Sequence, residues 1–314
     1  MGVDSGGSSS SRQSAREREE GTPFFVLGAQ RSGTTMLRLM LNRHPRIAVP
    51  HETAFITVFL PRLAEYGDLA DQANVARLLA DIASYHLVVR GGHVRSKEAV
   101  LSHPIQSYSD LVSAIMFEYA RAEGKARWGD KTPFYTQDID VLWNLFPGCQ
   151  FIHLVRDGRD VALSQTGISW LPNSVPQIAA DWRHKTTICH KVGRALPRGS
   201  FLEIRYEDLV TRTEETLRTI CGFLGESYSS EMLSYHATAL EVVPEESLKW
   251  HRSSVRPPDP SKIGRWKHEL CRADRIIFEQ IAGDALGLFG YPRERLTTTL
   301  GSRIRNAVYF GIGR

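Results

Sequence analysis

One segment constrains the fold more than any other: FFVLGAQRSGTTMLRLML, residues 24 to 41, in which an apolar run is followed by a glycine loop and an apolar helical pattern. Gly28 and Gly33 have the spacing of the two glycines in the phosphate-binding motif G-x-x-x-x-G-K-[ST], but Thr34 stands in the lysine position. In such a loop, backbone N–H groups and the N-terminus of the next helix point at one place. The segment therefore predicts a strand, a loop that holds a tetrahedral anion, and a helix.

Arg31 is the candidate replacement for the missing lysine, because it precedes Gly33 by two residues and its planar guanidinium can grip an oxyanion in two places. Thr34 and Thr35 add hydroxyl donors at the start of the helix. Without the lysine, and without a clear partner Asp after an apolar strand, the motif does not favour a magnesium site. The alternative is a tight strand-to-helix turn in which Arg31 is solvated and Thr35 caps the helix.

Apolar runs typical of strands alternate with helical patterns along the rest of the chain. The runs are RIAVP, ARW, CQFIHLV and SFLEIRY, at residues 46–50, 126–128, 149–155 and 200–206. The helical patterns cover residues 108–123, 174–195, 208–224 and 272–286. This alternation predicts an α/β fold, a single domain with a central, mostly parallel sheet flanked by helices.

The division of the chain follows from its composition. Residues 1–22 are rich in Ser, Gly and charge and are predicted to be a disordered tail. The folded domain is expected over residues 23–290, with a C-terminal extension over 291–314. Between Val242 and Lys262 the pattern fails and four prolines occur, which indicates a functional loop or lid.

Charge and cysteine content narrow the class of ligand and the compartment. The formal net charge is +4, and the scattered basic residues suit an anionic small ligand better than nucleic acid. The four cysteines lie far apart and are predicted to be reduced core thiols. No apolar run approaches the roughly 18 residues that span a bilayer, so a cytoplasmic protein is expected. His184 and His190 lack the spacing of metal ligands, and the oligomeric state stays open, with a homodimer among the alternatives.

A second strand-loop-helix segment, FIHLVRDGRDVALSQ, repeats the theme. Arg156 follows its apolar run and Ser164 lies eight residues further on. Ligands of open α/β sheets gather at the carboxyl ends of the strands, so both side chains are candidates to bind one phosphate of the same ligand. The alternative is a salt bridge from Arg156 or Arg159 to Asp157 or Asp160.

Together, GAQRSGTT and LVRDGRDVALS resemble the two nucleotide motifs of sulfotransferases that use 3′-phosphoadenosine 5′-phosphosulfate (PAPS). The resemblance implies the P-loop-like sulfotransferase fold, with the first motif around the 5′-phosphosulfate and Arg156 and Ser164 around the 3′-phosphate. It extends from about Pro23 to Trp266 and is closest to the branch that contains the tyrosylprotein sulfotransferases, which also have Arg in RSGTT.

Four further stretches carry the same resemblance: HPRIAVPHET, GDKTPF, IRYEDLV and SKIGRWKHEL. The first two imply a catalytic Glu52 and a catalytic Lys131 beside Arg31, and Trp266 in the last is expected to be a core or loop anchor. The nucleotide-binding residues that the resemblance implies are Gly28, Arg31, Ser32, Gly33, Thr34, Thr35, Arg156, Ser164, Tyr206, Lys262, Gly264 and Arg265.

The resemblance implies sulfuryl transfer from PAPS to a hydroxyl, with adenosine 3′,5′-bisphosphate (PAP) as the by-product and no metal required. Glu52 is the candidate general base, and His51 is the alternative, although its side chain should point the other way if a strand runs through both. By itself, Glu52 fits equally well as a carboxylate at the N-terminus of a helix over TAFITVFL.

The acceptor is expected to be a small molecule, lipid or carbohydrate rather than a protein tyrosine, because no membrane anchor or disulfide pattern is visible. Two other classes of protein stay open at this point. One is a P-loop kinase or nucleotidase with a shifted cation, which needs Mg²⁺ and a triphosphate. The other is a nucleotide-binding module without catalysis.

Overall fold

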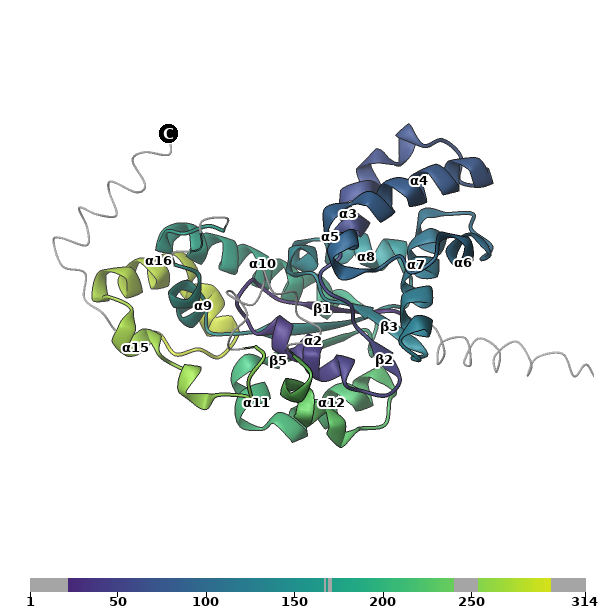
Figure 1. Cartoon of the computed structure of the whole chain (residues 1–314). Coiled ribbons are helices and arrows are strands. Elements are labelled where there is room, and N and C mark those ends of the chain that lie inside the picture. Colours follow the sequence, from purple (N-terminus) through teal and green to yellow (C-terminus); the bar gives the residue numbers. More distant parts are fainter. Residues whose placement is uncertain (1–21, 167, 169–170, 240–253, 295–314) are drawn as a thin grey trace, which may run out of the picture.

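The computed structural model describes residues 22–166, 168, 171–239 and 254–294 (Figure 1). Residues 1–21 of the expected tail, residues 242–253 of the expected loop, and the residues after Glu294 lie outside this description. Within it, no helix has the length and apolar character of a membrane span.

Five parallel strands form a sheet in the order β2-β3-β1-β4-β5. Every residue of the central strand β1 is buried, because helices cover both faces of the sheet. The predicted α/β fold with a parallel sheet is therefore confirmed. The strands are β1 (Phe24–Leu27), β2 (Ile47–Ala48), β3 (Arg127–Asp130), β4 (Gln150–Val155) and β5 (Phe201–Arg205).

Helices of very different length connect the strands. The α-helices are α2 (Thr34–Asn42), α3 (Phe55–Phe59), α4 (Gln72–Ser84), α5 (His86–Gly91), α6 (Lys97–Leu101), α7 (Tyr108–Ala122), α8 (Ile139–Leu145), α9 (Gly158–Gln165), α10 (Val175–Ala195), α11 (Tyr206–Thr211), α12 (Thr213–Leu224), α15 (Trp266–Glu269) and α16 (Arg272–Leu288). Short 3-10 helices are η1 (Leu60–Glu65), η2 (Pro133–Gln137), η3 (Ser230–Ala237) and η4 (Pro260–Lys262).

The side chains of β1 alternate between two separate cores, as the period of a strand requires. Phe25 and Leu27 pack into the core beneath α4, α7 and α8. Phe24 and Val26 face α2, α11 and α12 on the other side of the sheet. A third core lies where α9, α10 and α16 meet, at the left of Figure 1. The described helices thus enclose the sheet on both faces and leave the ends of its strands open to a ligand.

Local sequence signals account for several helix boundaries. The side chains of Asp71 and Ser107 accept hydrogen bonds from the first turns of α4 and α7. The expected single helix over 208–224 is wrong, because the backbone of Arg212 leaves the helical region (φ −131°, ψ 50°) and separates α11 from α12. α16 matches the predicted terminal helix and continues to Leu288.

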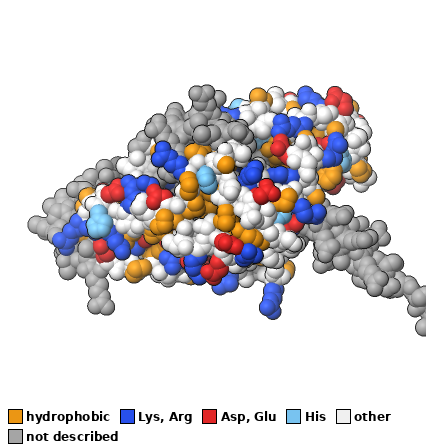
Figure 2. Space-filling view, turned by 60° about the horizontal axis from the view of Figure 1, so that its bottom comes forward, with side chains coloured by type: hydrophobic (Ala, Val, Ile, Leu, Met, Phe, Trp, Pro, Cys, Tyr) orange, Lys and Arg blue, Asp and Glu red, His pale blue; other side chains and the backbone are white. Residues whose placement is uncertain are grey.

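Two further expectations need correction. Cys149, Cys189 and Cys221 are buried free thiols as predicted, but Cys271 is exposed. Tyr291 was placed in the extension, yet its side chain is buried and its hydroxyl donates to Glu207 at 2.8 Å, so it packs with the domain. On the face shown in Figure 2, basic and acidic side chains are interspersed, in line with the scattered charge of the sequence.

Parallel strands bring the segments that follow them to one edge of the sheet. The glycine loop follows β1, Lys131 follows β3 and Arg156 follows β4. Glu52 comes four residues after the end of β2. Segments far apart in the sequence therefore meet at the carboxyl edge, where the candidate residues lie.

Candidate active site

The glycine loop turns the chain from β1 into α2. A Cβ on Gly28 would lie 2.6 Å from the carbonyl oxygen of Leu154, and a Cβ on Gly33 would lie 2.5 Å from the Tyr206 ring. Gly33 has a φ of 95° and Arg31 a φ of 68°, both in the left-handed region. Only glycine fits at the two close approaches, and the strained Arg31 backbone is typical of a functional loop.

The start of α2 has the features of an anion site. Its N-cap is Gly33, not Thr35, and no side chain caps the helix among the residues described. Its first N–H groups therefore lack an intrahelical partner and point out of the helix end. The alternative of a solvated Arg31 is wrong: its Nε donates to Ser164 Oγ at 3.1 Å, and its pKa is lowered by burial and then by the charge of Arg156.

Two of the predicted loop residues shape the loop without lining the pocket. The N–H of Gly28 donates to Thr136 Oγ1 at 2.8 Å, so this donor serves the protein itself. Ser32 is fully buried, and its hydroxyl has no hydrogen-bond partner in the part of the chain that the structure describes. Sequence reasoning grouped both with the ligand-facing residues because the motif does not distinguish them.

The second cluster joins the first directly. Arg156 follows β4 and donates through Nη1 to the carbonyl oxygen of Arg31 at 3.1 Å. Ser164 on α9 accepts from Arg31 at 3.1 Å. Both clusters therefore line one pocket, which is lined by Gln30, Arg31, Gly33, Thr34, Thr35, Met36, Glu52, Pro133, Phe134, Arg156, Ser164, Leu171, Tyr206, Ser254, Lys262 and Arg265.

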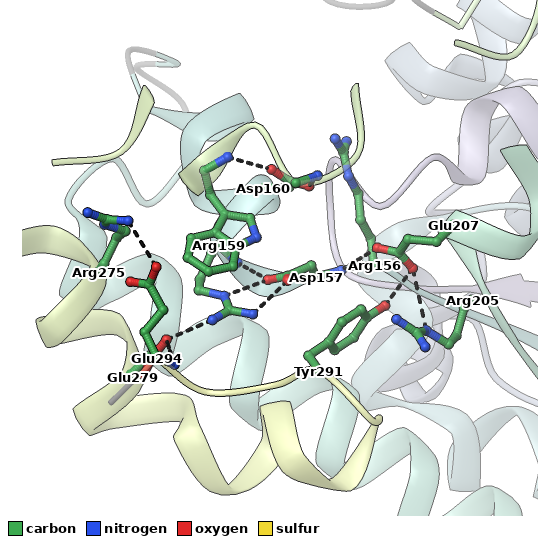
Figure 3. Close-up of polar contacts among 12 residues, drawn as sticks. Arg156, Asp157, Arg159, Asp160, Arg205, Glu207, Arg275, Glu279, Tyr291 and Glu294 are labelled. Atoms are coloured by element: carbon green, nitrogen blue, oxygen red, sulfur yellow. Dashed lines mark hydrogen bonds and ion pairs between the residues drawn. The ribbon is translucent and has the colours of Figure 1, made fainter. Parts of the chain in front are cut away.

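The salt-bridge alternative for the second motif is right for Arg159 and wrong for Arg156. Arg159 pairs with Asp157 at 2.8 Å and with Glu279 at 2.7 Å. The guanidinium of Arg156 points away from these carboxylates in Figure 3 and lies 4.4 Å from the centroid of the Tyr206 ring. Tyr206 thus packs between the glycine loop and Arg156 and holds both in place.

Lys131 and Glu52 form the second polar group of the pocket. Lys131 Nζ lies 2.5 Å from Glu52 Oε1 and 3.3 Å from Thr35 Oγ1. The lysine side chain is 2% exposed and that of Glu52 is 24% exposed. Burial lowers the pKa of Lys131, while the adjacent Glu52 carboxylate opposes this shift. Glu52 lines the pocket and Lys131 supports it from behind.

Glu52 and His51, the two candidate bases, differ in their positions relative to the pocket. The reasoning from strand alternation does not apply, because β2 ends at Ala48. His51 does not line the pocket, and burial, with the charge of Lys131 and other cations, lowers its pKa to about 3. The helix-terminus role of Glu52 also fails, since α3 begins only at Phe55 and Glu52 pairs with Lys131. Of the two residues, Glu52 is the one that lines the pocket.

A buried network that the sequence did not reveal supports this pair. The carboxylate of Asp130 is fully buried and accepts from the hydroxyls of Thr53 and Thr132, the latter at 2.9 Å. The Thr53 hydroxyl also lies 3.1 Å from that of Tyr135. Burial raises the pKa of Asp130 to about 6. Thr53 adjoins Glu52 and Asp130 adjoins Lys131, so the network fixes the two neighbouring backbones.

The third contribution comes from the segment before α15. Lys262 and Arg265 line the pocket as expected, whereas Gly264 does not. Gly264 has a φ of 72°, and its N–H donates to Asp160 at 2.7 Å. Trp266 is 2% exposed and packs against Arg159, which agrees with the predicted anchor.

The two histidines without ligand spacing have ordinary places. His184 is exposed on α10, and His190 contacts the carboxylate of Glu203 at 3.0 Å. In the described part of the chain, no group of three or more His, Cys, Asp or Glu side chains has the arrangement of a metal site.

The protein is an α/β protein with a P-loop-like turn after its central strand and cationic side chains after the neighbouring strands. This arrangement is typical of proteins that bind anions at the carboxyl edge of the sheet. Residues 23–230 match the family model described as the sulfotransferase family. The chain belongs to this family, as the two motifs predicted.

Relatives and solved structures agree with this assignment. The chain is 24% identical over 255 residues to protein-tyrosine sulfotransferase of Drosophila melanogaster, covering 79% of this chain and 47% of that protein. It is 26% identical over 297 residues to nodulation protein NoeE of Sinorhizobium fredii, covering 85% and 65%. The sulfotransferase domain from the Synechococcus PCC 7002 olefin synthase shares the fold, with a TM-score of 0.59 at 23% identity, covering 85% of this chain and 95% of that domain. The chain thus spans about half the length of the fly relative.

Proposed function

We propose that the protein transfers a sulfuryl group from PAPS to a hydroxyl of an acceptor. The observation that carries the proposal is the single pocket in which the glycine loop and the Arg156–Ser164 cluster touch through Arg31. A nucleotide with separate 3′ and 5′ anionic groups matches two adjoining cation sites, whereas a triphosphate needs only one extended site.

The residues divide into those that bind and those that react. The free N–H groups at the start of α2, with Arg31 and Thr34, bind the 5′-phosphosulfate. Arg156, Ser164, Lys262 and Arg265 surround the 3′-phosphate. Because Tyr206 packs against both Gly33 and Arg156, it keeps the two ends at a fixed separation.

Glu52 accepts the proton of the acceptor hydroxyl as its oxygen attacks sulfur. The bond from sulfur to the 5′-phosphate oxygen breaks, and the phosphate of PAP gains negative charge. Lys131, Arg31 and the loop N–H groups stabilise that charge. Lys131 is already within hydrogen-bond distance of both Glu52 and Thr35, so it links the base to the phosphate end of the pocket.

The acceptor lies on the Glu52 side of the pocket. Pro133, Phe134 and Leu171 also line the pocket, and Phe134 is 46% exposed. These apolar groups favour a small-molecule, lipid or carbohydrate hydroxyl with an apolar part. Several relatives are named as protein-tyrosine sulfotransferases, so a peptide tyrosine is the alternative acceptor to include.

Thermal unfolding with nucleotides tests the donor. PAP should raise the melting temperature by several degrees at about 100 times its Kd, equivalent to about 2.7 kcal/mol, and ATP far less. Equal shifts from PAP and ATP would remove the 3′-phosphate argument. A requirement for Mg²⁺, revealed by loss of activity in EDTA, would instead favour the kinase or nucleotidase.

A direct assay identifies the acceptor and tests for catalysis. Cell extract is incubated with ³⁵S-labelled PAPS and the labelled molecule is identified by mass spectrometry. Transfer of label that depends on Glu52 supports the enzyme. Binding of PAP without any transfer would indicate the non-catalytic nucleotide-binding module.

A further inference from the structure

The loop from Pro260 to Trp266 carries two of the pocket's cations. Lys262 and Arg265 line the pocket, and the left-handed Gly264 lies between them. Lys262 is the last residue of the short 3-10 helix η4, and Arg265 lies on the irregular stretch between η4 and α15. The positions of both charges therefore depend on what holds this backbone.

Asp160 holds it from the first turn of α9. This residue, labelled in Figure 3, is 1% exposed. Its two oxygens accept from two backbone N–H groups, Gly264 at 2.7 Å and Trp266 at 2.9 Å. Hydrogen bonds to an ionised carboxylate are about twice as strong as neutral ones. The amides lie on either side of Arg265, so one carboxylate fixes the backbone from which Arg265 projects.

Two neighbours of Asp160 act on the same loop. Arg156 Nη2 donates to the carbonyl oxygen of Lys262 at 2.9 Å. The guanidinium carbon of Arg159 lies 3.6 Å from the centroid of the Trp266 ring. The motif RDGRD thus contacts the loop at residues 262, 264 and 266, and Arg156 also contacts the glycine loop.

We propose that Asp160 is a positioning residue that holds the backbone of residues 264–266, and with it Arg265, against the 3′-phosphate end of the pocket. The inference rests on the proposed function, because it concerns how that site recognises its nucleotide. As an anion whose oxygens already accept two amides, Asp160 does not bind phosphate itself. It sets the preference for nucleotides with a 3′-phosphate over those without one.

The variant Asp160→Asn tests this. An amide keeps the size of the side chain but presents N–H donors to one of the two backbone N–H groups, so that hydrogen bond is lost. Calorimetric titration should show PAP binding weakened by about tenfold or more, as expected for one bond to a charged group. Binding of 5′-AMP, which lacks the 3′-phosphate, should change little.

Glu279→Gln is the matched control. Glu279 is also buried and pairs with Arg159, but it does not contact the loop. The variant Glu279→Gln should lower the melting temperature without changing the ratio of PAP affinity to AMP affinity. If Glu279→Gln changes that ratio as much as Asp160→Asn does, Asp160 is only one part of a general structural network and the proposal is wrong.

A double-mutant cycle gives a second readout. Since Asp160 acts through the backbone that carries Arg265, the effects of Asp160→Asn and Arg265→Ala on PAP affinity should be less than additive. Full additivity would contradict the proposal. Hydrogen exchange of the wild type without nucleotide covers the case in which Asp160→Asn does not fold: slow exchange at the Gly264 and Trp266 amides supports the anchor and fast exchange refutes it.

The two proposals fail in distinguishable ways. If wild type binds PAP no more tightly than AMP, the proposed function fails, whereas the exchange result still decides whether Asp160 anchors the loop. If wild type prefers PAP and Asp160→Asn keeps that preference, only the role of Asp160 is refuted.

Discussion

Replacing Glu52 by Gln removes the proposed base while keeping the shape of the side chain. The change also deprives Lys131 of the carboxylate 2.5 Å away, and the lysine side chain is only 2% exposed. Removing one partner of a buried ion pair costs about 3–5 kcal/mol. The cost here should be smaller, about 1–3 kcal/mol, because Glu52 is 24% exposed and Lys131, whose pKa is lowered by burial, can lose its proton. This corresponds to a loss of about 2–10 °C in melting temperature.

Turnover should fall by much more than stability accounts for. Loss of a general base lowers the rate by about 10²–10⁴-fold. PAP affinity should be kept, since the residues around the phosphates are unchanged. The assay is transfer of ³⁵S label from PAPS at saturating nucleotide, with PAP affinity measured in parallel by calorimetry.

Glu226→Gln is the control for the loss of a buried charge. The Glu226 side chain is 6% exposed and lies 3.8 Å from the buried Arg127, away from the pocket. This variant should lose stability but keep its turnover. The reasoning is refuted if Glu52→Gln turns over at the wild-type rate, or if both variants lose activity in proportion to their stability.

Three further predictions concern the pocket and its surroundings. Arg156→Lys should weaken the affinity for PAP, measured by calorimetry, by about tenfold, because lysine lacks the planar guanidinium that donates to two carbonyl oxygens. An unchanged affinity would rule out a role of Arg156 in binding. Gly33→Ala should destabilise the fold and abolish PAP binding, because the added methyl group would lie 2.5 Å from the Tyr206 ring and Gly33 has a φ of 95°. A second substitution, Tyr206→Ala, should restore part of the lost melting temperature. The free energy of unfolding, measured in urea, should fall as the pH is lowered from about 6.5 toward 3. His51 has a pKa lowered to about 3 in the folded protein and stays neutral there, while His51 of the unfolded chain takes up a proton. His51→Gln should flatten this pH dependence, and equal slopes of wild type and variant would contradict the prediction.

The sequence predicted those parts of the fold that depend on local patterns. The strands and α2, α7, α10 and α16 lie where apolar runs and helical spacing put them. The two nucleotide motifs also met at one edge, because parallel strands bring their carboxyl ends together. The division between α11 and α12 was missed, since it depends on the backbone of Arg212 and no proline or glycine marks it.

Hydrogen bonds between residues far apart in the sequence could not be predicted from local sequence patterns. Asp130 and Thr53 are 77 positions apart, and Asp160 and Trp266 are 106 positions apart. Motif reasoning named Asp160 only as a member of a salt bridge, because a carboxylate beside an arginine is usually paired with it. Its actual partners are backbone amides, which leave no signature in the sequence.

The anchoring of residues 262–266 by α9 also defines the smallest piece of chain that can form the whole pocket. The family match ends at residue 230, yet the pocket includes Lys262 and Arg265. A fragment cut at that boundary would leave the carboxylate of Asp160 buried without its two amide donors and would remove Glu279 from Arg159. The segments after residue 230 are therefore needed to complete the pocket, and an expressed domain needs to extend through Tyr291.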